Sequence, residues 1–415
     1  MTVFQTIALL LTITAAGACF NYRILKLHAS VGMMIYAMLI SLGAILLNHF
    51  GILDLSSATA FVSSLNFPNI LLHGLLSFLL FAGALNIHLG DLKKHRAIVA
   101  LLATVSVVIA TFITGSLVWL TADRLGFNIP YIDALMFGAL ISPTDPVAVM
   151  GILKETKMSA DLRTKIGSES LLNDGVGVVT FLALLGIAEH PHLSISAAQI
   201  AVLTVWEGCG GILMGLALGW IGLQILRAID DYKVEVLVTL ALCAGGYCIS
   251  EIANVSAPIS MVATGLVIGN QGRILGMSSR TRRHLDMFWE LLDEILNAIL
   301  FMLMGLEMIV ITITPSEMPM GLVAIAAVLI GRYISVMIPV SMMRKRYGFG
   351  SGTATLLTWG GLRGGISIAL ALSLPNLADK NLLLAMTYVT VVFSVLVQGT
   401  TFHRVARAVV GGKED

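Results

Sequence analysis

The sequence predicts an all-α polytopic membrane protein with thirteen transmembrane helices. Hydrophobic residues make up 57% of the 415 residues and charged residues only 12%, whereas a soluble globular chain carries roughly 25% charged residues. Apolar runs of about 20 residues recur along the whole chain, which is the length that a helix needs to cross a bilayer. Basic residues gather in alternate connections between these runs.

The thirteen expected helices are separated by short polar connections. They cover residues 2–20, 30–50, 69–88, 97–121, 131–153, 164–188, 197–226, 233–252, 256–270, 284–311, 320–342, 351–374 and 382–403. No Lys or Arg precedes the first run, so we interpret it as a transmembrane helix and not as a signal peptide. No linker or low-complexity tract is present. We therefore expect residues 1–415 to form a single membrane domain without a soluble regulatory domain.

The distribution of basic residues predicts the orientation of the chain. One set of alternate connections, together with the C-terminal tail, holds 21 of the 25 Lys and Arg residues, and the opposite set holds only Arg124 and Lys380. By the positive-inside rule, the N-terminus lies outside and the C-terminus is cytoplasmic, in a cell (inner) membrane. The remaining two basic residues, Arg332 and Arg363, lie inside expected helices.

Charge and cysteine content exclude other classes of protein. A net charge of +1, with few residues of either sign, argues against nucleic-acid binding, which needs a dense basic surface. The four cysteines lie in apolar stretches and form no CxxC pair, so they predict neither a metal site nor a disulfide framework.

Two of the expected helices contain residues that interrupt an α-helix. The run 131–153 contains "ISPTDPVAV", in which Pro143 and Pro146 cannot donate to the carbonyls one turn earlier. The run 351–374 contains "TWGGLRGGIS", whose glycines weaken helix formation around Arg363. We expect both helices to unwind near the bilayer centre.

The interrupted helices occupy matching positions in the two halves of the chain. Each is the fifth helix of a six-helix unit, one spanning about 2–188 and the other about 233–403, with the helix 197–226 as a spacer. The two units start on opposite sides of the membrane, so they form inverted repeats. Interrupted helices at equivalent places in inverted repeats indicate the binding site of a secondary transporter. The alternative is that Pro and Gly only kink the helices.

A third motif, "SESLLNDGVG", places acidic side chains inside the run 164–188. A charge at the bilayer centre costs roughly 2.5–3.5 kcal/mol, so such residues are usually functional. Helical spacing puts Ser170, Asn173 and Asp174 on one face and Glu169 to the side. A buried acid must be paired or protonated, and Arg332 and Arg363 are the available partners. Spacing leaves open which acid pairs with which arginine.

The three motifs, in this order and spacing, closely resemble the cation/proton antiporter superfamily, specifically the NhaP-like branch of sodium/proton exchangers. The resemblance covers essentially the whole chain. It implies a transport core and a dimerisation bundle, a homodimer in the lipid bilayer, and exchange of a monovalent cation for protons. No cofactor is implied.

The resemblance also implies the residues of the site. Asp174 would alternately bind a cation and a proton, while Ser170 and the main chain at Thr144 help to coordinate the cation. Asn173 belongs to the same predicted cation- and proton-binding set and stands where electrogenic relatives carry a second aspartate, which implies an electroneutral exchanger. Na⁺ would therefore be bound at Asp174, Ser170 and Thr144.

Two charged pairs are implied as structural supports. Glu169 would pair with Arg332, and Asp145 and Arg363 would stabilise the crossing of the interrupted helices. In one respect the chain departs from the pattern, because Ala82 in "LLFAGALNIHL" stands where many relatives have a glutamate. That difference puts in doubt any coordination network that uses this position.

The chemistry of these residues is consistent with obligatory exchange. A carboxylate deprived of water needs a counter-cation, and either H⁺ or a hard alkali ion such as Na⁺ or Li⁺ can serve. One negative charge with two mutually exclusive partners gives one-for-one exchange, on which membrane voltage does no work. The alternatives are K⁺/H⁺ exchange by the same fold, a cation channel, and an intramembrane aspartyl protease with Asp145 and Asp174 as its dyad.

Three glycines, Gly211, Gly215 and Gly219, repeat at a spacing of four in the run 197–226. This spacing permits close contact between helices. The contact can be a dimer interface or packing within one chain.

Overall fold

The computed structural model describes residues 3–145, 160–189, 197–311, 313–347, 349–350, 352–375 and 379–410. Within these residues all the regular secondary structure is helical. The elements of the first part of the chain are α1 Val3–Phe20, η1 Asn21–Leu25, α2 Ala29–His49, α3 Ser56–Leu65, α4 Phe67–Ile70, η2 Leu71–Leu75, α5 Leu76–Leu85, α6 Leu89–Ala103, α7 Val105–Arg124, α8 Tyr131–Ile141 and α10 Ala160–Glu189.

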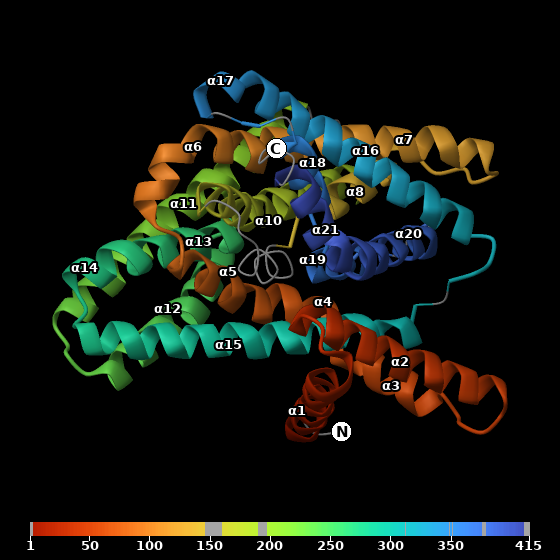
Figure 1. Cartoon of the computed structure of the whole chain (residues 1–415), viewed down its shortest axis with the longest axis horizontal. Helices are drawn as coiled ribbons and strands as arrows, with labels where there is room; N and C mark the ends of the chain where they lie inside the picture. The colour runs from red at the N-terminus through yellow and green to blue at the C-terminus, as the bar shows by residue number, and fades with distance from the viewer. Residues whose placement is uncertain are drawn as a thin grey trace.

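The second part of the chain continues the helical pattern (Figure 1). Its elements are α11 Ala197–Arg227, α12 Tyr232–Ile252, α13 Ala257–Val267, η3 Ile268–Gly272, α14 Arg273–Leu275, α15 Ser279–Leu306, η4 Glu307–Ile309, α16 Met318–Met342, α17 Arg344–Tyr347, α18 Thr353–Trp359, α19 Gly365–Leu372, α20 Lys380–Phe393, η5 Ser394–Gln398 and α21 Gly399–Val410. Four of the η elements are π-helical turns, and η4 is a 3₁₀ turn.

Nine helical segments in the described residues are long and apolar enough to cross a membrane. The four other expected runs are shorter, interrupted or partly charged. The described part of the run 131–153 contains only α8, and the run 256–270 is the short helix α13 with η3. The run 351–374 is divided into α18 and α19, and α15 carries charged residues through its first half.

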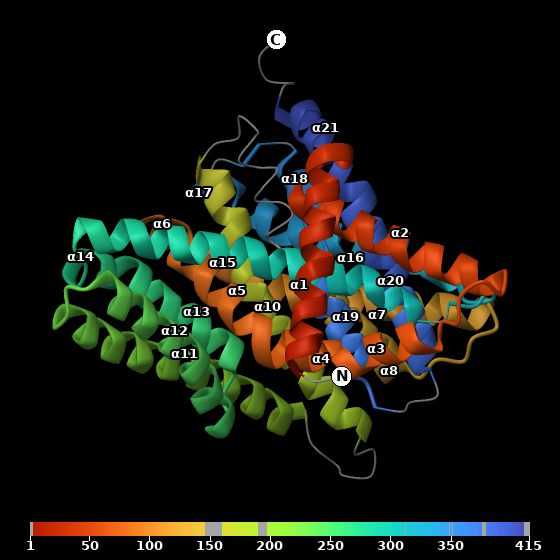
Figure 2. The same ribbon diagram turned by 90° about the horizontal axis from the view of Figure 1, so that it is seen from below.

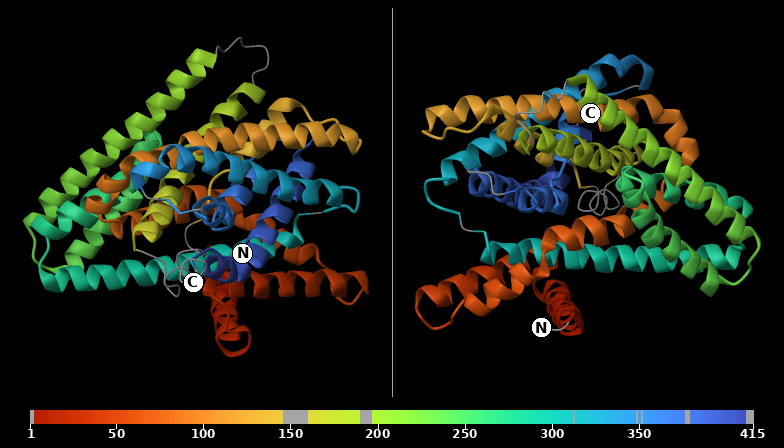
Figure 3. Two further views of the ribbon diagram at one scale, coloured as in Figure 1. Left: turned by 45° about the horizontal axis from the view of Figure 1, so that its top comes forward. Right: turned by 180° about the vertical axis from the view of Figure 1, so that it is seen from behind.

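Large apolar side chains cover the outside of the molecule, as a lipid-facing surface requires. On α11, which lies along one edge of the molecule (Figure 3), Trp206, Leu213 and Trp220 are 66%, 68% and 61% exposed. The protein is therefore a multi-pass membrane protein.

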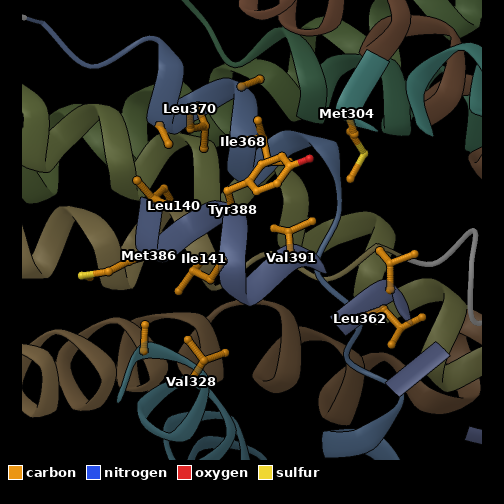
Figure 4. Packing of buried hydrophobic residues seen from close by; sticks show 14 of the residues in the cluster. Leu140, Ile141, Met304, Val328, Leu362, Ile368, Leu370, Met386, Tyr388 and Val391 are labelled. Atoms are coloured by element: carbon orange, nitrogen blue, oxygen red, sulfur yellow. The ribbon is translucent and has the colours of Figure 1, made fainter. Parts of the chain in front are cut away.

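The interior contains two hydrophobic clusters. The larger one joins side chains of α2, α7, α8, α16, α19 and α20 with the end of α15. Figure 4 shows part of it, where Tyr388 of α20 lies among Ile141, Ile368 and Val391. The smaller cluster joins α5, α11, α12, α13 and the first half of α15. The second view of the molecule (Figure 2) shows α11, α12 and α13 together at one end.

Glycines allow α7 to pack closely between α8 and α16. A Cβ added to Gly138 of α8 would lie 2.3 Å from the carbonyl oxygen of Thr111, and one added to Gly331 of α16 would lie 2.3 Å from Oγ1 of Thr114. Because α8 leads into the Pro143 motif and α16 carries Arg332, these contacts position both sides of the site.

The glycine repeat of α11 packs within the chain. A Cβ on Gly211 or Gly215 would meet the carbonyl oxygens of Ser256 or Ser260, and one on Gly219 would meet Val267. All three glycines therefore lie against α13 and the residue before it. Of the two contacts that the spacing permits, the structure contains the one inside the monomer.

Candidate functional site

Both interrupted helices unwind at the predicted motifs. Helix α8 ends at Ile141, and residues 142–145 are not helical. Helix α18 ends at Trp359, and α19 begins at Gly365. The two unwound segments meet, because the N–H of Asp145 donates to the carbonyl oxygen of Leu362 over 2.7 Å. Pro146, which was expected to contribute to the first interruption, lies outside the described residues.

Arg363 satisfies carbonyl groups that the interruption leaves without helical partners. Pro146 has no N–H to donate to the carbonyl of Ser142. Nη1 of Arg363 donates to that oxygen and also to the carbonyl oxygen of Pro143 over 3.0 Å. The N–H of Arg363 itself donates to Oγ of Ser394 over 2.9 Å. Arg363 is only 2% exposed and therefore joins the two unwound segments in the interior.

Asp145 lies at the same crossing. A Cβ added to Gly364 would come within 2.4 Å of Oδ2 of Asp145, so the carboxylate lies directly against this glycine. The crossing is thus held by the main chain of Asp145 and by the guanidinium of Arg363 on carbonyl oxygens. Sequence reasoning identified both residues but missed the acceptors on Ser142 and Pro143 and the hydroxyl of Ser394.

Glu169 and Arg332 form a buried ion pair between α10 and α16. Nη2 of Arg332 lies 2.7 Å from Oε1 of Glu169, and the two side chains are 4% and 1% exposed. Nε of Arg332 lies beside Gly361 in the second unwound segment, where an added Cβ would come within 2.9 Å. Arg332 therefore contacts both α10 and the interruption between α18 and α19.

A network of hydrogen bonds connects Thr144 to α10. The N–H of Thr144 donates to Oδ1 of Asn173 over 3.1 Å, and Nδ2 of Asn173 donates to Oγ1 of Thr144 over 2.7 Å. Nδ2 of Asn173 also donates to Oε1 of Glu169 over 3.3 Å. The hydroxyls of Thr144 and Ser170 are 3.0 Å apart. Each of these residues is at most 2% exposed.

Asp174 lies beside this network and is 5% exposed. Within the described residues, its carboxylate has neither a hydrogen bond nor an ion pair. Its electrostatic neighbours are two further acids, Asp145 and Glu169. Within the described residues, these three acids and the two arginines together carry a net charge of −1 when all five groups are ionised.

Two small residues, Gly177 and Ala82, affect the packing and the chemistry of the site. A Cβ on Gly177 of α10 would lie 2.2 Å from Cγ of Pro143, so this glycine lets the first interruption approach α10. Ala82 of α5 is 2% exposed, and its methyl group offers no oxygen ligand to the site.

This fold and this site define a membrane transporter for small cations. The chain belongs to the sodium/hydrogen exchanger family, because the profile described as "Sodium/hydrogen exchanger, transmembrane" matches residues 7–408. The chain is 41% identical over 416 residues to the Na(+)/H(+) antiporter NhaP of Pseudomonas aeruginosa, a match that covers 98% of this chain and 97% of that protein. It is 36% identical over 306 residues to the Na(+)/H(+) antiporter NhaH of Halobacillus aidingensis, covering 72% of this chain and 74% of that protein.

A solved structure has the same fold. The sodium proton antiporter MjNhaP1 of Methanocaldococcus jannaschii superimposes with a TM-score of 0.76, covering 99% of this chain and all of that one. The two sequences are 20% identical, so this likeness concerns the fold alone.

Proposed function

We propose that the protein exchanges Na⁺ or Li⁺ for H⁺ across a membrane, and that the carboxylate of Asp174 holds one or the other at every stage. The observation that carries this proposal is the burial of Asp174 without a basic partner among the described residues. The two arginines of the site are engaged elsewhere, Arg332 by Glu169 and Arg363 by carbonyl oxygens. A cation from solution is then the natural partner of the remaining charge.

The neighbouring oxygens suit a hard alkali cation. Oγ1 of Thr144 accepts from Nδ2 of Asn173 and shares a second hydrogen bond with the hydroxyl of Ser170. When Thr144 donates this second bond, each of the two hydroxyl oxygens keeps one lone pair for a cation beside Asp174. Unwinding of residues 142–145 also exposes main-chain oxygens, as in other transporters with interrupted helices. Those of Ser142 and Pro143 accept from Arg363, so the proposed main-chain ligand is the carbonyl oxygen of Thr144. Asn173 uses its amide oxygen and nitrogen to hold Thr144. Its role in the proposal is therefore to position a ligand.

One site with two mutually exclusive occupants gives exchange. When the Na⁺-loaded and the protonated forms of Asp174 cross the membrane, both carry the same charge, so the stoichiometry is one for one and the exchange is electroneutral. The neutral side chain of Asn173 supports this stoichiometry, because it adds no second proton site. Movement of one helix bundle against the other would expose Asp174 to each side in turn.

The proposed architecture has thirteen transmembrane helices. The nine apolar helical segments and the four shorter or interrupted runs support this number. The inverted repeats would span about 2–188 and 233–403, with the helix 197–226 between them, in a single membrane transporter domain over residues 1–415. A homodimer in the inner membrane, with the N-terminus outside and the C-terminus cytoplasmic, completes the proposal.

Transport by purified protein in liposomes containing a pH-sensitive dye tests the proposed function. Adding Na⁺ or Li⁺ should dissipate an imposed proton gradient, and Asp174→Asn should abolish this response. Asp133→Asn is a matched control, because Asp133 is 6% exposed and lies at the far end of α8 from the interruption. Exchange that persists in Asp174→Asn would remove this residue from the mechanism. A response to K⁺ alone would replace Na⁺ by K⁺ as the substrate.

A further inference from the structure

A cavity with polar and apolar lining residues lies away from the site, between the connection from α5 to α6 and the helix α14, which is at one end of the molecule (Figure 2). Its volume is about 270 Å³. It lies between the connection from α5 to α6, the π-helical turn η3 and the start of α15, and its polar lining residues are His88, Asn270, Arg273 and Arg282. None of these residues takes part in the proposed exchange.

Hydrogen bonds of Asn270 fix the walls of this cavity. Oδ1 of Asn270 accepts from the N–H of Leu89 over 2.8 Å, and Nδ2 donates to the carbonyl oxygen of Ile87 over 2.8 Å. A single side chain thereby ties η3 to the main chain on both sides of His88. The cavity is a built feature of the fold, because its opposite walls come from segments about 180 residues apart and are joined by these bonds.

The two arginines give the cavity a surplus of positive charge. Nη2 of Arg273 lies 2.6 Å from Oδ1 of Asp286, which is the one acidic partner of this pair of guanidinium groups among the described residues. Nε and Nη2 of Arg282 donate to the carbonyl oxygen of Met277 over 3.2 and 3.1 Å. Nε of Arg273 is buried and has no acceptor within the described part of the chain. A buried donor of this kind costs free energy unless a ligand accepts from it.

A phosphate group fits these donors. Guanidinium groups bind phosphate oxygens through charged hydrogen bonds, often two at once. His88 adds a third polar side chain to the wall. The shared chemistry of possible occupants is thus a phosphate monoester or diester, either on a lipid headgroup or free in solution.

The apolar rim of the cavity favours a lipid. Ile274 lines the cavity and is 74% exposed, and the next residue, Leu275, is 54% exposed. An acyl chain lying along these side chains would cover them while its phosphate occupied the cavity. The basic connection 271–283 also lies on the side that the positive-inside rule makes cytoplasmic, where basic pockets between helices bind anionic lipids.

We propose that the cavity lined by His88, Asn270, Arg273 and Arg282 binds the phosphate headgroup of an anionic phospholipid at the cytoplasmic face. The lipid holds the connection between α5 and α6 against α14. Its binding therefore stabilises the folded protein, independently of which cations the protein exchanges.

The test is lipid-dependent thermal unfolding of the purified full-length protein in a neutral detergent, followed by tryptophan fluorescence. Phosphatidylglycerol should raise the unfolding temperature, whereas phosphatidylcholine and inorganic phosphate should not. The half-saturating concentration of phosphatidylglycerol should rise about fivefold for each of Arg273→Gln and Arg282→Gln. Arg283→Gln is the matched control, because it removes the same charge from the neighbouring position but lies outside the cavity lining.

Each other outcome overturns the proposal. An equal weakening by Arg283→Gln would indicate general attraction to a basic surface. Equal stabilisation by inorganic phosphate would assign the cavity to a soluble anion, and equal stabilisation by phosphatidylcholine would remove the role of charge. If a variant is too unstable for melting curves, phosphatidylglycerol bound to the folded fraction is counted by native mass spectrometry, with Arg282→Gln again expected below Arg283→Gln. These readouts need no cation gradient, so they stand whether or not exchange is observed.

Discussion

At the scale of single residues, most polar side chains of the site have hydrogen-bond or ion-pair partners within the protein, whereas one carboxylate has none among the described residues. Asn173 makes three hydrogen bonds, with the N–H and hydroxyl of Thr144 and with the carboxylate of Glu169. Glu169 is also paired with Arg332. The carboxylate of Asp174 has no such contact within the described residues. An asymmetry between adjacent residues of one helix is what a site for an exchangeable ion requires, since the bound ion must be able to leave.

Asn173→Asp tests the positioning role of the amide. The substitution keeps an acceptor for the N–H of Thr144 but removes the donor to the Thr144 hydroxyl and to Glu169. It also places a second carboxylate beside Glu169. We expect destabilisation of about 1–3 kcal/mol from the lost and unsatisfied groups, together with a lower apparent affinity for Na⁺. Thermal unfolding and Na⁺ titration in liposomes measure the two effects. An increase in Na⁺ affinity would show that the network does not hold Thr144 as a ligand.

The ion pair of Glu169 and Arg332 predicts a strong dependence on both partners. Removing one partner leaves a buried, uncompensated charge, so Glu169→Met or Arg332→Met should each destabilise the protein by about 3–5 kcal/mol. The double variant should be more stable than either single variant, because no lone charge remains. By contrast, the exposed pair of His73 and Glu251 should contribute at most about 1 kcal/mol. Thermal unfolding of these three variants and of Glu251→Gln tests this, and additive losses in the double variant would contradict it.

At the scale of elements, the two interruptions were predictable because the responsible residues act locally. Pro143 removes a donor from its own helix, and the glycines around Arg363 weaken their own helix, whatever the surroundings. Other elements depend on contacts that a single sequence does not contain. The helix α3, Ser56–Leu65, lies in a stretch expected to be a connection, and α6 begins at Leu89, before the expected run 97–121. Charged residues at positions 91–96 obscured that start, although they are compatible with a helix near the membrane surface.

The contacts of the site also divide into those that the local sequence predicts and those that depend on tertiary packing. Helical spacing predicted that Ser170 and Asn173 share a face with Asp174, because that relation depends on α10 alone. The spacing left the partners of Arg332 and Arg363 open, and only the family resemblance assigned Glu169 to Arg332. The acceptor of the Arg363 N–H is Ser394, at the end of α20. No local signal marks this serine, because the contact arises from how the second unwound segment packs on η5.

The glycines at the crossing predict a loss of function when they are enlarged. A methyl group at Gly364 would overlap the carboxylate of Asp145, and one at Gly361 would press on Nε of Arg332 and on Thr144. Gly361→Ala and Gly364→Ala should therefore displace the crossing and reduce exchange by at least about tenfold. Gly43→Ala on α2 is the control, because nothing lies within 4 Å of the added Cβ. Normal exchange by both crossing variants would mean that the two unwound segments tolerate a change in their separation.

At the scale of the whole molecule, the proposal makes one carboxylate responsible for coupling two ion fluxes. Protons and Na⁺ compete for Asp174, so below the pKa of this group the half-saturating Na⁺ concentration should rise about tenfold for each unit that the pH falls. The maximal rate at saturating Na⁺ should change much less. Both quantities follow from Na⁺ titrations in liposomes at several pH values. A half-saturating concentration independent of pH would separate the proton site from the cation site.

The proposed exchange of one Na⁺ for one H⁺ at a single carboxylate predicts that transport is electroneutral. Among the described residues, the three acids and two arginines of the site carry a net charge of −1, and either one Na⁺ or one H⁺ on Asp174 changes it by the same amount. Since the loaded and protonated forms then cross with equal charge, the membrane potential contributes no free energy to the cycle. Exchange rates measured at a membrane potential imposed with K⁺ and valinomycin should therefore equal those measured at zero potential. Asn173→Asp adds a further acid, so it is the variant most suited to introduce a voltage dependence. A rate in the unmodified protein that rises steeply with voltage would require unequal charges on the two crossing forms, and hence a second titrating group besides Asp174.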